Sequence, residues 1–225
     1  MSELYLIRHG QASFGAKNYD KLSELGMQQA KWLGEYFQQR EIAFSRLWLG
    51  DLVRHQETAE GICSALPLAP EKVTQASLNE FDFQNIASAY LRLFPHEKPA
   101  VDAKPAEFYR LLKKAMKAWS GDRLPKELLT ESWQQFRERV EQSRQDICAA
   151  DDGNPVLVVS SGGAIAMFMG LVLGLGAEQV IELNMQIKNS AFSHFYFNQH
   201  TVRLSSFNNI PHMDVPDRFS KITFS

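Results

Sequence analysis

Residues 156–176, VLVVSSGGAIAMFMGLVLGLG, contain no charged side chain, so the chain must bury them either in a lipid bilayer or in a protein core. The opening VLVV is rich in β-branched residues, follows the breaker run DDGNP and ends at SSGG, which is typical of a buried parallel strand. The following AIAMFMGLVLGL has a helical composition. Gly170 and Gly174 have the spacing of small residues at membrane helix contacts, but this helix is too short to span a bilayer and lacks aromatic or basic anchors. The sequence therefore predicts a strand, a tight turn and a helix.

The composition is that of an ordinary globular protein, with 225 residues of which 44% are hydrophobic and 22% charged. We expect a single domain over residues 1–225. The formal net charge of -2 gives no reason to expect nucleic acid or an anionic membrane surface as a partner. The amino-terminal MSELYLIRHG has no basic region followed by a cleavage site, so we expect no signal peptide and a cytoplasmic location.

The cysteines and several histidines show no metal-binding pattern. Cys63 and Cys148 lie among apolar positions without a CxxC partner, so we expect buried side chains and neither a disulfide framework nor a zinc site. Four further histidines have no metal-ligand spacing and are expected to be structural or exposed: His96, His194, His200 and His212. We therefore predict no catalytic metal.

Two predicted strands each lead into a segment that contains an arginine. Residues 4–7 form a short apolar strand that ends in Arg8 and His9, and strands of α/β sheets present their carboxyl ends to ligands. A helix follows in LSELGMQQAKWLGEYF, with Ser23 as its expected N-cap. A second strand at residues 46–49 is followed by a helix with Arg54 near its start.

The middle of the chain, at about residues 84–150, is mostly helical in pattern. One apolar stripe contains Phe108, Leu111, Leu112, Ala115 and Trp119, and another contains Trp133, Phe136, Val140 and Ile147. We expect this insertion to cap the sheet and to shape a pocket. Near the carboxyl end, AFSHFYFNQHTVRLSSFNN alternates and breaks at NQHT, which predicts a β-hairpin. The predicted fold class is α/β, a three-layer α/β/α sandwich with a mixed, mostly parallel central sheet and a helical insertion.

The ordered motifs LIRHGQAS, LSELGMQQA, DLVRHQETAE, LNEFDF and VVSSGGAIA resemble those of the histidine phosphatase superfamily, which includes cofactor-dependent phosphoglycerate mutases. The resemblance extends over nearly the whole chain. Each residue taken alone is better explained as a surface charge or a structural side chain, and it is the joint order that favours a functional site.

This resemblance implies roles for individual residues. His9 would be the nucleophile that becomes a phosphohistidine, and Arg8 and Arg54 would hold the phosphate oxygens. Glu80 would protonate the departing alcohol, with a pKa raised by burial beside Phe81. The backbone N–H groups at the SSGG turn, including that of Gly162, can face an anion at the start of a helix. Asn18 falls where relatives have a polar substrate contact, in a loop that is longer or shifted here.

The family usually has a second histidine in an SHGG turn, where this chain has Ser161. A serine hydroxyl donates a hydrogen bond to phosphate but supplies no positive charge. His55 is a candidate replacement, although adjacent residues of a helix point about 100° apart, which directs it away from Arg54.

Three functions remain open from the sequence. The first is a metal-independent phosphomonoester hydrolase that needs no cofactor and acts on a small-molecule phosphate ester. The second is a catalytically impaired phosphate-ester-binding or regulatory protein, and the third is a phosphoglycerate mutase-like phosphotransferase. Retention of His9, both arginines and Glu80 favours an enzyme, because a binding protein has no use for a leaving-group acid.

Overall fold

The computed structural model describes residues 1–13, 20–100 and 102–224. Within this part of the chain, six strands form one sheet in the order β3-β2-β4-β1-β5-β6. Four are parallel, namely β1 (Ser2–Arg8), β2 (Arg46–Leu49), β3 (Glu71–Thr74) and β4 (Val156–Ser160). The hairpin of β5 (Phe192–Phe197) and β6 (Val202–Asn209) joins β1 in antiparallel orientation. The predicted α/β class with a mixed, mostly parallel sheet is confirmed.

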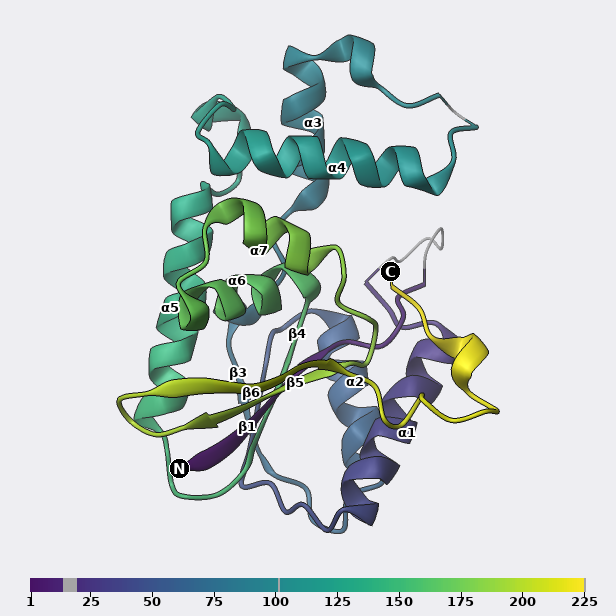
Figure 1. Ribbon diagram of the computed structural model, residues 1–225, viewed down its shortest axis with the longest axis vertical. Helices are drawn as coiled ribbons and strands as arrows, with labels where there is room; N and C mark the ends of the chain where they lie inside the picture. The colour runs from purple at the N-terminus through teal and green to yellow at the C-terminus, as the bar shows by residue number, and fades with distance from the viewer. Residues whose placement is uncertain (14–19, 101, 225) are drawn as a thin grey trace.

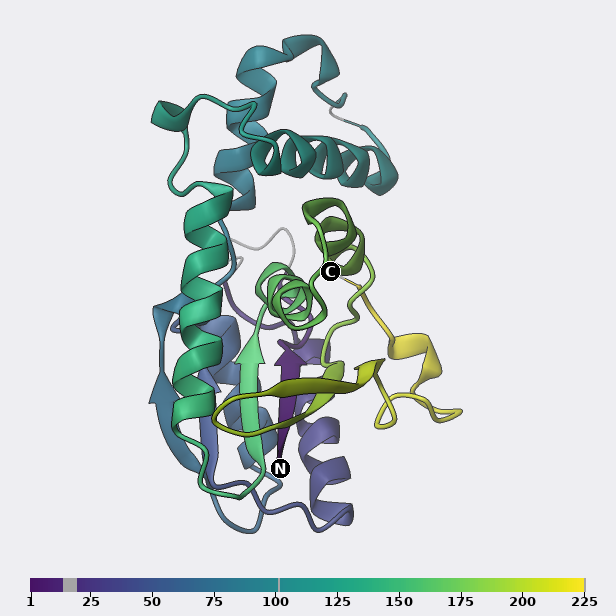
Figure 2. The same ribbon diagram turned by 60° about the vertical axis from the view of Figure 1, so that its left-hand side comes forward.

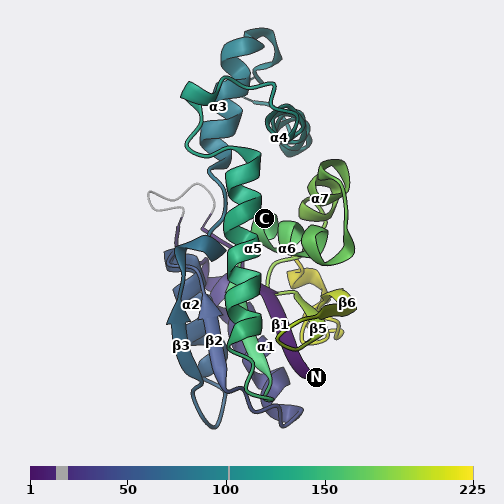
Figure 3. The same ribbon diagram turned by 90° about the vertical axis from the view of Figure 1, so that its left-hand side faces the viewer.

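Helices cover both faces of this sheet (Figures 1 and 3). One face carries α1 (Glu24–Gln39) and α2 (Val53–Cys63), and the other carries α5 (Trp133–Ala149) and α6 (Gly162–Leu173). Both faces need cover because successive apolar side chains of β1 point to opposite sides of the sheet. Tyr5 and Ile7 pack in the core beneath α1 and α2, whereas Leu4 and Leu6 pack in the larger core on the other face.

The uncharged run at residues 156–176 forms the central strand β4 and the helix α6. Every residue of β4 is buried, and α6 ends at Gly174, whose φ of 67° favours glycine. A Cβ at Gly170 would lie 2.4 Å from a methyl carbon of Val180 in α7 (Ala177–Asn184), so this glycine permits close helix packing. Among the described residues, no helix is both long enough and apolar enough to cross a bilayer.

Two further helices lie beyond the carboxyl end of the parallel strands (Figure 2). They are α3 (Phe83–Leu93) and α4 (Pro105–Ser120), and α4 is joined to α7 by ion pairs of 2.5 Å from Lys113 to Glu182 and from Lys117 to Glu178. Together with α5, they account for the helical pattern predicted at 84–150. Trp119 of the predicted α4 stripe is buried, but Phe108 is 50% exposed because it faces a pocket rather than the core.

Candidate functional site

The carboxyl end of β1 forms the floor of a pocket of about 580 Å³, which lies between the sheet and the helices α3 and α4. Four residues that the sequence singled out line it together: Arg8, His9, Arg54 and Glu80. Arg8 is the last residue of β1, Arg54 is in the first turn of α2, and Glu80 follows the strand β3. Parallel strands bring these separate segments to one edge of the sheet.

His9 is held in one orientation by two hydrogen bonds. Its Nδ1 lies 2.7 Å from the carbonyl oxygen of Gly10, which can only accept, so Nδ1 carries the proton. Its Nε2 then accepts a hydrogen bond of 3.2 Å from Nε of Arg54. Burial, together with the charges of Arg54 and Arg8, lowers the pKa of His9 well below its usual value. The imidazole is therefore neutral at physiological pH, and the lone pair of its Nε2 accepts the hydrogen bond from Arg54.

The two arginines supply fixed positive charge. Nη1 of Arg54 forms a 2.6 Å ion pair with Asp20, whose second oxygen accepts a 2.9 Å hydrogen bond from the amide of Val53. Asp20 thus holds both the guanidinium and the first turn of α2, a role that no motif in the sequence indicates. Arg8 donates through Nη1 to the carbonyl oxygens of Ile187 and Phe224, so the carboxyl-terminal segment lies against the site.

Glu80 is a buried carboxyl group next to the start of α6. Its Oε2 accepts a 2.9 Å hydrogen bond from the amide of Gly163, and its Oε1 accepts one of 3.1 Å from the amide of Phe81. Burial raises the pKa of Glu80, and the Gly163 amide partly opposes that rise. A Cβ at Gly163 would lie 2.2 Å from Oε1, so only glycine permits this approach.

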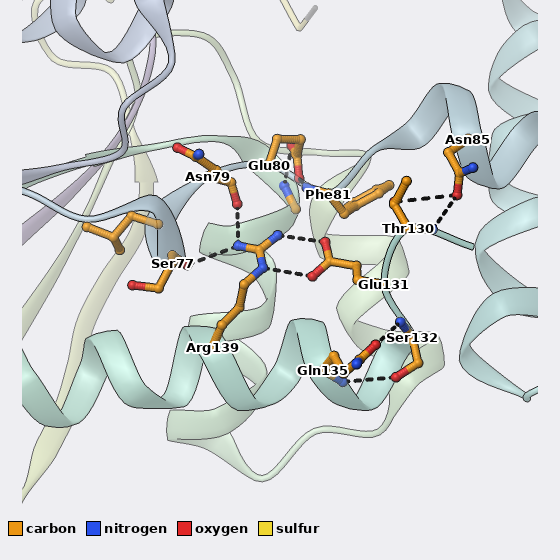
Figure 4. Close-up of polar contacts among 12 residues, drawn as sticks. Ser77, Asn79, Glu80, Phe81, Asn85, Thr130, Glu131, Ser132, Gln135 and Arg139 are labelled. Atoms are coloured by element: carbon orange, nitrogen blue, oxygen red, sulfur yellow. Dashed lines mark hydrogen bonds and ion pairs between the residues drawn. The ribbon is translucent and has the colours of Figure 1, made fainter. Parts of the chain in front are cut away.

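Arg139 of α5 fixes the segment that carries Glu80 (Figure 4). Its Nη1 donates to the carbonyl oxygens of Ser77 at 3.0 Å and Asn79 at 2.7 Å, while Nε and Nη2 each lie 2.8 Å from a carboxylate oxygen of Glu131. The bidentate pair with Glu131 orients the guanidinium. The carbonyl oxygen of the residue before Glu80 is therefore anchored to a helix.

Ser161 and His55 form a buried pair beside this site. Nε2 of His55 lies 2.7 Å from Oγ of Ser161, and both side chains are inaccessible to solvent. The ring of His55 lies 5.8 Å from that of His9, nearer than its position in the helix suggested. Burial and the charge of Arg54 lower the pKa of His55 well below its usual value, so the pair adds no positive charge.

The other predicted site residues either do not line the pocket or lie outside the described residues. Gly162 is buried, and a Cβ there would lie 3.6 Å from the guanidinium carbon of Arg8, while neither Gly162 nor Ser161 lines the pocket. Asn18 lies outside the described residues. No group of three or more His, Cys, Asp or Glu side chains in the described part of the chain is arranged to hold a metal ion.

The chain is similar over most of its length to proteins of known family. A probable phosphoglycerate mutase from Photorhabdus laumondii is 25% identical over 96% of this chain and 97% of its own length. A putative alpha-ribazole-5'-P phosphatase from Escherichia coli has the same fold, with a TM-score of 0.69, 20% identity and coverage of 92% of this chain and 96% of that one. A phosphoserine phosphatase variant from Entamoeba histolytica, in complex with phosphoserine, has a TM-score of 0.66, 19% identity and coverage of 95% and 100%.

The family model for the histidine phosphatase superfamily (branch 1) matches residues 4–210. This range begins in β1 and ends directly after β6, so it includes the whole sheet apart from the first residues of β1. It contains His9, Arg54, Glu80 and the SSGG turn. The match covers far more than half of the chain, and the chain therefore belongs to the histidine phosphatase superfamily, branch 1.

Proposed function

We propose that this protein is a metal-independent phosphomonoester hydrolase that acts through a phosphohistidine at His9. The observation that carries the proposal is the joint geometry of a neutral histidine, two arginines and a buried carboxyl group with a raised pKa around one pocket. These are the groups that phosphoryl transfer requires: a nucleophile, fixed charge for the phosphate oxygens and an acid for the leaving oxygen.

In the first step, the lone pair on Nε2 of His9 attacks phosphorus while the bond from phosphorus to the ester oxygen breaks. Nδ1 of His9 already donates to the carbonyl of Gly10, which leaves Nε2 as the nucleophilic atom. The ester oxygen leaves with the bonding electron pair and takes the proton of Glu80, so the alcohol departs neutral. Arg54, whose Nε now donates to His9, turns its donors to the phosphate oxygens as the substrate enters.

In the second step, water attacks the phosphohistidine. The ionised Glu80 accepts a proton from this water, the bond from phosphorus to nitrogen breaks, and its electron pair returns to Nε2. Inorganic phosphate leaves and both residues regain their starting protonation states. Arg8 and Arg54 stabilise the charge on the equatorial oxygens in both steps, which is where preorganised donors contribute most to phosphoryl transfer.

We further propose that Ser161 occupies the position of the second histidine of the superfamily. Because its hydroxyl bonds to a neutral His55 behind the pocket wall, the phosphate site has one cation fewer than the resemblance implies. This observation also supports a second candidate, a phosphate-ester-binding protein with little turnover. It is less favourable to a mutase, which must retain its phosphoenzyme and bind the product again.

The test is hydrolysis of p-nitrophenyl phosphate in the presence of a chelator, from about pH 5 to about pH 8. We expect turnover by the wild-type protein, an acid-labile phosphorylated species by mass spectrometry, and loss of both in His9→Ala. His200→Ala, which replaces an exposed histidine outside the site, should behave as wild type. Because the pKa of His9 is lowered, activity should persist below about pH 6.5, where an ordinary histidine becomes protonated.

Equal background rates in the wild-type protein and His9→Ala would exclude general phosphatase activity. Binding of phosphate esters without turnover would then support the second candidate. Interconversion of phosphoglycerate isomers that exceeds hydrolysis would instead identify a mutase.

A further inference from the structure

The charged groups of the pocket lie at its floor. Among the described residues that line it, Arg8 and Arg54 are the cations, and both are assigned to the phosphate group in the proposed mechanism. Glu80 is the acidic group, and burial raises its pKa. The floor therefore matches one phosphate group, and no further cation is among the described residues that line the pocket.

The walls of the pocket are apolar and mainly aromatic. They are formed by side chains from the Glu80 segment, α3, α4 and the carboxyl-terminal segment, among them Phe81, Phe83, Phe108, Tyr109, Leu112 and Phe224. Phe81 is fixed from behind, with ring centroids 5.1 Å from Trp119 and 5.4 Å from Phe136. Phe108 is 50% exposed and Phe224 is 52% exposed, so the outer wall presents partly exposed apolar surface.

The lysines of α4 are directed elsewhere. Lys113 and Lys117 form ion pairs of 2.5 Å with Glu182 and Glu178 of α7, and Lys114 forms one of 2.9 Å with Glu97. None of these three lysines lines the pocket. The three lysines of α4 thus face carboxylates outside the pocket, whereas Phe108 and Tyr109 of the same helix line it.

We infer that the substrate is a phosphate monoester of an apolar alcohol that carries an aromatic ring, an inference that rests on the proposed hydrolase function. A volume of about 580 Å³ accommodates such a group together with the phosphate. The ring would pack between Phe81 and the α4 side chains, and the neutral Gln84, Ser88 and Asn184 on the lining can bind a hydroxyl or amide of the same molecule.

The same walls disfavour esters with a carboxylate, such as phosphoglycerate or phosphoserine. A carboxylate placed among these side chains would lose its hydration, and the described lining offers it no cation besides the two arginines assigned to the phosphate, which is unfavourable. A further cation outside the lining is Lys188, whose Nζ lies 6.0 Å from the ring centroid of Phe224 at the outer wall. Small anionic esters should therefore be poor substrates even though relatives of this fold bind them.

The decisive comparison uses two esters of the same alkyl chain, phenylpropyl phosphate and carboxypropyl phosphate. The leaving group of both esters is a primary alcohol, so the chemical step is equally difficult for both. A difference in kcat/KM then reflects contacts with the pocket wall. We expect kcat/KM for the phenyl ester to be larger by roughly 10- to 100-fold, as for burial of one large apolar side chain. Equal values, or a preference for the carboxylate, would overturn the inference.

A charged substitution in the wall should weaken the preference for the phenyl ester. Phe108→Arg places a cation on the pocket lining at a half-exposed position, and we expect it to narrow the ratio of the two kcat/KM values at least about tenfold. The matched control is Leu93→Arg, which adds the same charge to a 43% exposed position of α3 outside the pocket and should leave the ratio unchanged. A similar change of the ratio in both variants would mean that the added charge acts through its overall field and that contacts with the pocket wall do not determine the preference.

Binding separates this inference from the proposed catalysis. Phenylbutyl phosphonate and carboxybutyl phosphonate cannot be hydrolysed, so calorimetric titration of wild type and His9→Ala measures recognition alone. Tighter binding of the phenyl compound, together with absent turnover of every ester, would uphold the substrate class and reject the hydrolase. Turnover of both esters, with no preference for the phenyl compound in hydrolysis or in binding, would uphold the hydrolase and reject the substrate class.

Discussion

The hydroxyl of Ser161 is fully buried and bonded to His55, so its effect on catalysis depends on a pair rather than on one residue. A histidine at position 161 would meet the ring of His55, because Oγ and Nε2 are already 2.7 Å apart. Placing a further charged donor in the proposed phosphate site therefore requires both positions to change.

We predict that the double variant Ser161→His/His55→Ala gains activity. A new imidazole near the phosphate supplies a donor, and one preorganised donor is typically worth about a hundredfold or more in rate. The measurement is kcat/KM for p-nitrophenyl phosphate, with Ser161→His alone as the matched control, which should lose stability through crowding. A double variant no faster than wild type would mean that the pocket operates with the neutral pair.

The residues that the sequence could identify are those whose chemistry is visible in a motif. Arg8, His9, Arg54 and Glu80 do meet at one pocket, although their roles remain proposals. Asp20 could not be found in this way, because a carboxylate in a loop gains its role only when folding brings it to Arg54. The aromatic wall could not be predicted from the sequence for a related reason. Phe108 fits an apolar helical stripe that predicts burial, and its exposure follows from the tertiary position of α4.

At the level of elements, the Glu80 segment depends on α5 for its position. Arg139 bonds the carbonyls of Ser77 and Asn79 while Glu131 orients its guanidinium (Figure 4). These contacts anchor the backbone on the amino-terminal side of Glu80. The amides of Phe81 and Gly163 then fix its carboxyl group.

We predict that Arg139→Met lowers kcat for phenylpropyl phosphate by about tenfold to a hundredfold, because a small displacement of the acid weakens proton transfer. The rate with p-nitrophenyl phosphate should fall much less, since p-nitrophenolate is a good leaving group that needs little protonation. Arg144→Met is the matched control: Arg144 forms a bidentate pair with Glu141 on the same helix at similar exposure, but without contact to the Glu80 segment.

Equal decreases of kcat with both substrates would show that Arg139 contributes to the stability of the protein in general and not to the position of Glu80. Arg139→Lys provides a further distinction, because a single ammonium cannot reproduce the bidentate pair and both carbonyl contacts. It should show the same dependence on the leaving group as Arg139→Met, to a smaller extent.

The elements with strong apolar patterns were predicted well and the exposed ones were not. The strands at 4–7, 46–49 and 156–160 and the terminal hairpin are present, and Ser23 caps α1 by accepting from the amide of Gly26. The edge strand β3 was missed because most of its EKVT sequence is exposed and has no alternation to detect. The helix α7 was also missed, since its pattern follows directly after the glycine-rich end of α6.

At the scale of the whole molecule, burial of neutral histidines links stability to pH. His212 is 3% exposed, its Nε2 lies 2.8 Å from Oγ of Ser190, and burial together with Arg218 lowers its pKa to about 3. The pKa values of His9 and His55 are also well below the usual value. In the unfolded chain all three titrate near about pH 6.5. Below that pH the unfolded state binds protons that the folded state does not, so folding becomes less favourable as the pH falls.

We predict that the free energy of unfolding decreases steeply between about pH 6.5 and about pH 5, with each histidine contributing up to about 1.4 kcal/mol per pH unit. Glu80 opposes this trend, because its raised pKa adds stability that is lost as the pH rises through the folded-state value. Denaturant unfolding at several pH values measures the net slope. His212→Gln, which is neutral at every pH, should reduce the slope by one histidine's contribution, while His200→Gln at an exposed position should leave it unchanged. An unaltered slope in His212→Gln would mean that His212 binds a proton in the folded protein, and the acid sensitivity would then have to come from His9 and His55.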